Sequence, residues 1–172
     1  MGRVAGVVML AGLLLSYGCR GDGEGASGNF DQARDARYLQ QWCDTVVAAY
    51  PALMAVNAEA NKEARVTYFE HSRRLISRYM PQTPPAGLEE WHLGPYGSAT
   101  QLLADLERNA PSNELSETMD GFLAALAEPF PTVHVSRMQV AASGITSCQG
   151  AEMAGFEIGS VRLGGLDAPA WE

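Results

Sequence analysis

The chain has 172 residues, of which 47% are hydrophobic and 19% charged, and its formal net charge at pH 7 is −8. This composition is typical of a globular chain rather than a disordered one, and the length suits one domain better than two. No block of Lys or Arg occurs. An acidic chain without a basic patch repels phosphate backbones, so we expect no binding to nucleic acid.

Residues 1–18 have the features of a signal peptide. Arg3 supplies the positive charge near the start, and the charge-free apolar segment 4–15 is too short to cross a bilayer. Two small residues, Ser16 and Gly18, occupy the positions that cleavage requires. We therefore expect an exported protein.

Cys19 lies directly after this cleavage point, and a signal that ends before a cysteine resembles the lipobox of bacterial lipoproteins. Ser16 and Tyr17 depart from the usual motif, which has Leu and a small residue in those positions. The resemblance implies that the Cys19 thiol carries a diacylglyceryl group and becomes the new N-terminus. The expected location is the cell envelope, anchored by lipid to a bacterial membrane and facing outside the cytoplasm. The alternative is a secreted protein with a free thiol.

Residues 19–29 combine the lipidated cysteine with a predicted flexible tether. The segment is rich in glycine and contains no large apolar side chain, so it cannot bury enough surface to fold. A flexible linker behind an anchor needs this composition. The membrane is then one partner, through the lipid, and another envelope protein is a possible second one.

Cys43 and Cys148 are the other two cysteines of the chain. An even pair outside the cytoplasm favours a disulfide, although two inert thiols in the core are the alternative. A bridge would close a loop of about 100 residues and tie the first element of the domain to the last.

Residues 30–150 follow a mostly helical pattern. Apolar residues at three-and-four spacing predict a helix over 31–50 that breaks or kinks at Pro51, and a second helix over about 57–80. Thr83 is the expected cap of a third helix that has Pro84 in its first turn and runs toward Asn109. The pair Gly94-Pro95 should kink or split it.

The last part of the chain gives weaker signals. Ser112 or Asn113 opens a fourth helix that ends before Pro129 or Pro131. For 132–147 the pattern favours a helix over a strand. The segment 151–172 is a Gly-rich tail with short strand-like pieces around 156–163, either a loosely packed hairpin or disordered. The predicted fold is all-α, an antiparallel bundle of four to five helices with a Gly-rich C-terminal tail.

A second resemblance covers roughly residues 30–150. The chain is similar to uncharacterised exported helical proteins of bacteria, and the similarity implies no known activity. It depends on an early cysteine, a Pro-Pro-x-x-Leu-x-x-x-His stretch and a late cysteine, namely Cys43, Pro84, Pro85, Leu88, His92 and Cys148.

Glu89 and His92 form the one candidate metal motif. Glu-x-x-His is half of the ligand pattern of ferritin-like di-iron bundles, but the chain contains no second copy of it. His71 and His134 would have to converge with His92 to complete a site. We favour the simpler interpretation of a buried structural histidine, and we expect no cofactor and no bound metal.

Other catalytic patterns are missing, since the chain has no Gly-x-Ser-x-Gly, Walker-type loop or HExxH. The acidic residues Glu114, Glu117 and Asp120 fall in the first turns of a predicted helix, where carboxylates favour the positive end of the helix dipole. Six aromatic residues could line a groove, but we expect them mainly in the core: Trp42, Tyr50, Tyr68, Tyr79, Trp91 and Tyr96. The expected role is therefore non-enzymatic binding or envelope assembly. A metal-binding protein or metalloenzyme using Glu89 and His92 is the alternative.

Overall fold

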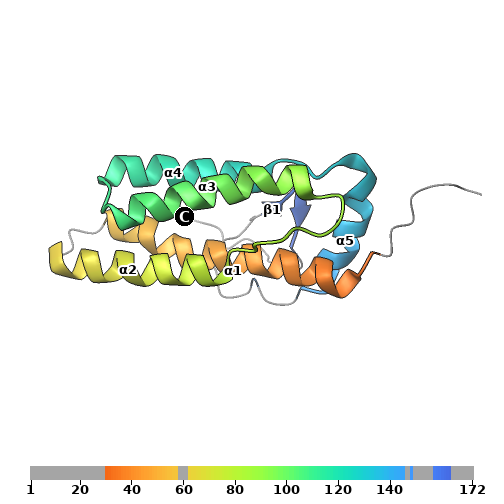
Figure 1. Cartoon of the computed structure of the whole chain (residues 1–172), viewed down its shortest axis with the longest axis horizontal. Helices are drawn as coiled ribbons and strands as arrows, with labels where there is room; N and C mark the ends of the chain where they lie inside the picture. Colours follow the sequence, from red (N-terminus) through yellow and green to blue (C-terminus); the bar gives the residue numbers. More distant parts are fainter. Residues whose placement is uncertain (1–29, 58–61, 146–147, 149–156, 164–172) are drawn as a thin grey trace, which may run out of the picture.

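The computed structural model describes residues 30–57, 62–145, 148 and 157–163, which form an all-α bundle. The predicted signal peptide and tether, with Cys19, lie outside these residues. The described residues form four long helices and a fifth, shorter one. The long helices run alternately in opposite directions, and the short helix lies at one end of the bundle (Figure 1). They are α1 (Gln32–Asn57), α2 (Lys62–Tyr79), α3 (Glu89–Glu107), α4 (Ser112–Ala127) and α5 (Val135–Ser143).

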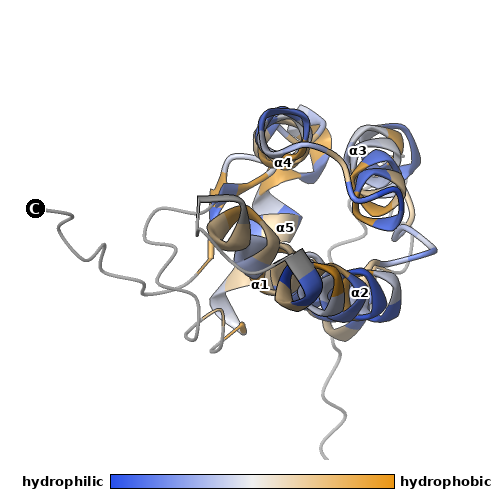
Figure 2. Cartoon of the chain, turned by 90° about the vertical axis from the view of Figure 1, so that its left-hand side faces the viewer, coloured by the Kyte–Doolittle hydropathy of each residue, from blue (hydrophilic) through white to orange (hydrophobic). Residues whose placement is uncertain are grey.

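The helices surround one hydrophobic core. α1 packs against α2, α4 and α5, and α3 packs against α2 and α4, so the four long helices close around a common interior, as the end-on view of Figure 2 shows. Amphipathic helices of this kind are stabilised mainly by burial of one face. The largest fully buried side chains are Trp42, Phe69, Phe122, Leu39, Ile76, Leu88, Leu102, Leu106, Leu115, Met119, Leu126 and Met138. Within the described residues, no helix combines the length and the apolar character needed to cross a membrane.

α1 continues through Pro51 and ends at Asn57, so of the predicted break or kink at Pro51 the break is wrong. A proline inside a helix removes one backbone donor and crowds the preceding turn. Ala49 and Ala52, on either side of Pro51, are fully buried in the core. Packing of the continuous helix therefore outweighs the local cost of the proline.

α3 begins at Glu89, and the predicted start at Thr83 and Pro84 is wrong. A residue that precedes a proline is pushed toward extended conformations, and here two prolines follow each other, so this stretch resists helical dihedrals. Gly87 then adopts a φ of +85°, which breaks any helix before it. From Glu89 the helix runs without interruption to Glu107, so Gly94-Pro95 does not split it.

The segment 132–143 is helical, as the pattern favoured. A short 3-10 helix, η1 (Thr132–His134), leads directly into α5, and the alternative of a strand is wrong for these residues. Met138, Ala141 and Ala142 bury one face of α5 in the core. Residues 146 and 147 lie outside the described part.

Part of the predicted tail forms a small antiparallel hairpin, with β1 (Glu157–Ile158) paired to β2 (Val161–Arg162). Gly159 at its turn donates its N–H to Leu126 O at 2.7 Å, and its carbonyl accepts from Phe130 N at 3.3 Å. The hairpin is therefore attached to the end of α4 rather than loosely packed. Its apolar side chains belong to the main core: Ile158, Val161 and Leu163.

Candidate functional site

His92 lies in the core among aromatic rings. It is 5% exposed, and its Nδ1 is 2.8 Å from the hydroxyl oxygen of Tyr38. The rings of Tyr38, Trp42 and Tyr96 lie with their centroids 5.8, 5.8 and 5.2 Å from the imidazole. Burial lowers the pKa of His92, and burial raises the pKa of the Tyr38 hydroxyl. The neutral pair shares one hydrogen bond between α1 and α3.

Glu89 does not join His92 in a common ligand set. The Glu89 side chain is exposed, and its Oε2 accepts the N–H of Gly87 at 2.8 Å in the turn before α3. His92 is turned inward instead. Among the described residues, no group of three or more His, Cys, Asp or Glu side chains is arranged to hold a metal ion.

The other two histidines lie in separate surroundings. His71 is exposed on α2 and lines a cleft between α1 and α2. His134 packs edge-on against Phe30, with the ring centroids 5.7 Å apart. The convergence of three histidines that the metal hypothesis requires is therefore not found in this fold.

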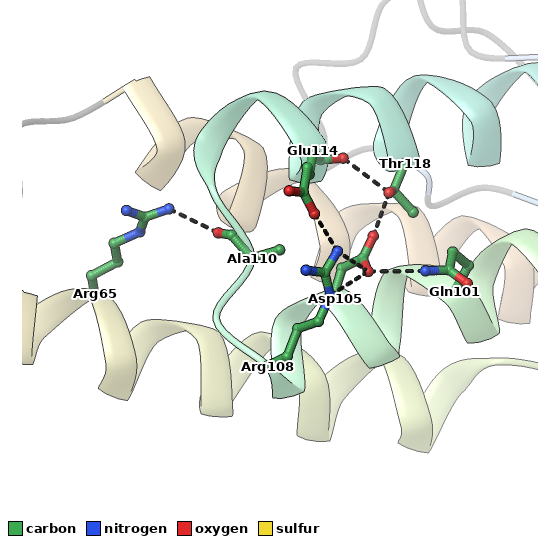
Figure 3. Close-up of polar contacts among 7 residues, drawn as sticks. All are labelled: Arg65, Gln101, Asp105, Arg108, Ala110, Glu114 and Thr118. Atoms are coloured by element: carbon green, nitrogen blue, oxygen red, sulfur yellow. Dashed lines mark hydrogen bonds and ion pairs between the residues drawn. The ribbon is translucent and has the colours of Figure 1, made fainter.

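Asp105 is the centre of a polar network that joins α3 to α4 (Figure 3). Its side chain is 2% exposed and accepts hydrogen bonds from Gln101 at 2.9 Å and from Arg108 at 3.1 and 3.2 Å. The Thr118 hydroxyl, from α4, donates to its second oxygen. Figure 3 also shows the Arg108 guanidinium held by Glu114. Of the three acidic residues predicted at the start of the fourth helix, Glu114 thus forms an ion pair with Arg108 across the connection between α3 and α4.

This network was not predicted from the sequence. The available signal is the spacing of Gln101, Asp105 and Arg108, which places all three on one face of a helix. Thr118 is thirteen residues beyond Asp105 and reaches it only because α3 and α4 are antiparallel. Beside the network, Arg65 of α2 donates to Ala110 O at 3.2 Å and ties a third helix to the same connection (Figure 3).

Cys43 and Cys148 lie at disulfide distance, with their Cα atoms 6.0 Å apart and a sequence separation of 105. Both side chains are buried, at 2% and 5% exposure. This Cα–Cα distance lies within the range that disulfides occupy. The pair joins the middle of α1 to the segment after α5.

Aromatic residues line two of the clefts that the described residues form. One, of about 550 Å³, lies between α1 and α2 and is lined partly by Tyr68 and Tyr79. The other, of about 370 Å³, lies between α3 and α4 and has Trp91 in its wall. Trp42, in contrast, is fully buried. The expectation that the aromatic residues belong mainly to the core is therefore confirmed for Trp42 and Trp91. Tyr68, Tyr79 and Tyr96 are half-buried and pack against the core, and Tyr50 is half-buried too.

Comparisons with protein-family models, with curated proteins and with solved structures found no match to this chain.

Proposed function

We propose that this protein is a non-enzymatic helical module that is held at the outer side of a bacterial membrane by an acylated Cys19. The observation that supports this most directly is the spatial pairing of Cys43 with Cys148, 6.0 Å apart between Cα atoms. Disulfides form and persist in oxidising compartments and are rare in the cytosol. A signal-like segment before Cys19 fits the same compartment.

The distance between the proposed anchor and the domain suits a surface tether. Ten residues separate Cys19 from Phe30, and α1 begins two residues later. Even when fully extended, such a stretch spans only about 35–40 Å. The bundle would therefore work within a few nanometres of the lipid headgroups, which favours a partner in the envelope over one that diffuses freely.

The buried polar side chains support a binding role rather than catalysis. Asp105 is satisfied by Gln101, Arg108 and Thr118, and the His92 imidazole is paired with a tyrosine hydroxyl in the core. These groups connect helices to each other, so they act as supports of the fold. Another molecule would then bind at the surface clefts.

The anchor is tested by expressing the full chain and the Cys19→Ser variant in a bacterium. We expect the native protein in the membrane fraction and the variant in the soluble fraction or left unprocessed. Intact-mass analysis should find the native N-terminus at Cys19 with acyl chains. A native protein that begins elsewhere, or that carries no lipid, would contradict the anchor and leave a secreted protein as the better interpretation.

A further inference from the structure

The cleft between α3 and α4 combines an apolar wall with two carboxylates. Trp91, Pro95, Ala125, Pro129 and Pro131 form most of the wall, and its volume is about 370 Å³. Its shape is stabilised by a hydrogen bond of 2.7 Å from the Trp91 indole N–H to Glu128 O, which holds α3 against the end of α4. The cleft is therefore a fixed feature of the helix packing.

The charged side chains that line this cleft are both acidic. Glu90 and Glu128 line it, both exposed, and neither forms an ion pair within the described residues. Glu128 is also the C-cap of α4, whose last turn contains no basic residue. A helix C-terminus carries a partial negative charge, so a carboxylate there is unfavourable unless a cation accompanies it.

The Glu90 side chain is not needed to complete the start of its own helix. Glu89, its neighbour, already accepts the free N–H of Gly87 at 2.8 Å in the turn before α3. Glu90 instead lines the cleft, as Trp91 does. An ammonium or guanidinium group that entered would meet two carboxylates and an aromatic ring, the combination that favours Arg and Lys side chains.

The surroundings of the cleft favour a peptide over a small amine. Leu93, one helical turn after Glu90, is 69% exposed, and Val133, two residues after Pro131, is 83% exposed. Single exposed apolar residues are common. Here two of them follow residues of the cleft wall in sequence, and only a ligand longer than the cleft could cover them.

We propose that this cleft binds an Arg- or Lys-bearing segment of a partner protein, with the basic side chain between Glu90 and Glu128 and apolar neighbours against Leu93 and Val133. This proposal rests on the proposed function. It adds the chemistry of the envelope partner, which must present an Arg or Lys side chain. Burial of a charge-paired basic anchor beside an aromatic ring is typical of a small interaction site.

The cleft can be filled without disturbing the core. A Cβ placed on Gly94, which lines the cleft, meets no heavy atom within 4 Å, and the same holds for Gly97, one turn further along α3 and outside the cleft. Leu is a better helix former than Gly at both positions. Gly94→Leu is therefore the blocking variant and Gly97→Leu its matched control, with circular dichroism and thermal unfolding to verify that both fold.

The probe is an array of nine-residue peptides with one fixed central residue, either Arg, Lys, Gln or Glu, and randomised neighbours. The full-length protein, in detergent if it is lipidated, is applied as native protein and as the two glycine variants. We expect peptides that bind the native protein and Gly97→Leu but not Gly94→Leu, and we expect them to carry Arg or Lys with apolar neighbours. For these peptides, the Glu90→Gln/Glu128→Gln variant should weaken binding by about tenfold or more.

Three results would overturn the proposal. One is that no peptide depends on Gly94. Another is that the dependent peptides are uncharged or acidic. The third is that spermidine or tetramethylammonium binds the cleft as tightly as the best peptide, which would indicate a small-amine site. None of these measurements depends on the lipid anchor. If Cys19 is lipidated but the peptide array gives a negative result, the proposal for the cleft is contradicted and the proposed anchor is not.

Discussion

Asp35 and Arg137 are 102 residues apart in the sequence and form a two-point ion pair, with Arg137 Nε 2.6 Å from Oδ2 and Nη2 2.7 Å from Oδ1. The Arg137 Nη1 also donates to Ala86 O at 2.7 Å, and the guanidinium lies 4.1 Å from the ring centroid of Phe30. One side chain of α5 thus holds the start of α1 and the turn that precedes α3. In the sequence, the start of α1 directly follows the proposed tether.

Replacing Asp35 by Asn should lower the free energy of unfolding by about 3–5 kcal/mol, because it leaves the mostly buried Arg137 without its counter-charge. The two side chains are 2% and 11% exposed. Urea unfolding measures the change. The control is Glu107→Gln, which breaks the exposed pair with Arg73, where the side chains are 72% and 41% exposed. That variant should change stability by less than about 1 kcal/mol. Equal effects of the two variants would contradict the role of the buried pair.

Reduction of the Cys43–Cys148 pair should destabilise the native protein by up to about 4.7 kcal/mol, the value for a loop of roughly 100 residues in the chain-entropy model. The melting temperature is compared with and without reductant, and alkylation followed by mass spectrometry counts the thiols. A Cys43→Ala/Cys148→Ala variant is the control and should not respond to reductant. Two free thiols in the native, unreduced protein would show that the pair is not bonded.

His92 should make the stability depend on pH. Burial lowers the pKa of His92 below 6.5, so the unfolded chain binds a proton at a higher pH than the folded protein does. The contribution of His92 is fully present above about pH 6.5 and is lost as the pH falls through its folded-state pKa. The slope of unfolding free energy below pH 6.5 should be reduced in His92→Gln, which should also lose roughly 1–3 kcal/mol at pH 8. His71→Gln, at an exposed position, is the control.

The same His92→Gln variant tests the metal hypothesis. Elemental analysis of the purified native protein should find no stoichiometric zinc or iron, because a transition-metal site needs about three or more converging ligands. One metal ion per chain that disappears in His92→Gln would contradict the structural role and restore Glu89 and His92 as a metal site.

Asp105→Asn should weaken the connection of α3 to α4 by about 1–3 kcal/mol, because the buried carboxylate accepts hydrogen bonds from both helices. Thr118→Val removes the partner in α4, and the double variant should lose less than the sum of the two single losses. Chemical unfolding of all three variants measures the coupling. Asp120→Asn, exposed on the same helix, is the control. Strict additivity would show that the two side chains act independently.

The sequence by itself determined the helices and the faces that they bury. Apolar spacing is local information, and Leu115, Met119, Phe122 and Leu126 recur at the period of a helix, so α4 was predicted nearly to its ends. The all-α class followed from the same periodicity. The limits of α1 and α3 did not follow. Packing of α1 against the rest of the bundle outweighs the local penalty of Pro51. The start of α3 is set by a different local rule than the cap at Thr83, because the two prolines and the positive φ of Gly87 exclude a helix before Glu89.

Only the tertiary structure decided which polar side chains meet. Asp35 and Arg137, or Asp105 and Thr118, carry no sign of their partners in the sequence, because long-range pairing depends on how whole helices dock. The cleft between Glu90 and Glu128 arises in the same way, from the start of α3 lying beside the end of α4. His92 shows the reverse case. Its place on an apolar stripe was local information and predicted its burial, whereas its hydrogen bond to Tyr38 required α1 to pack across it.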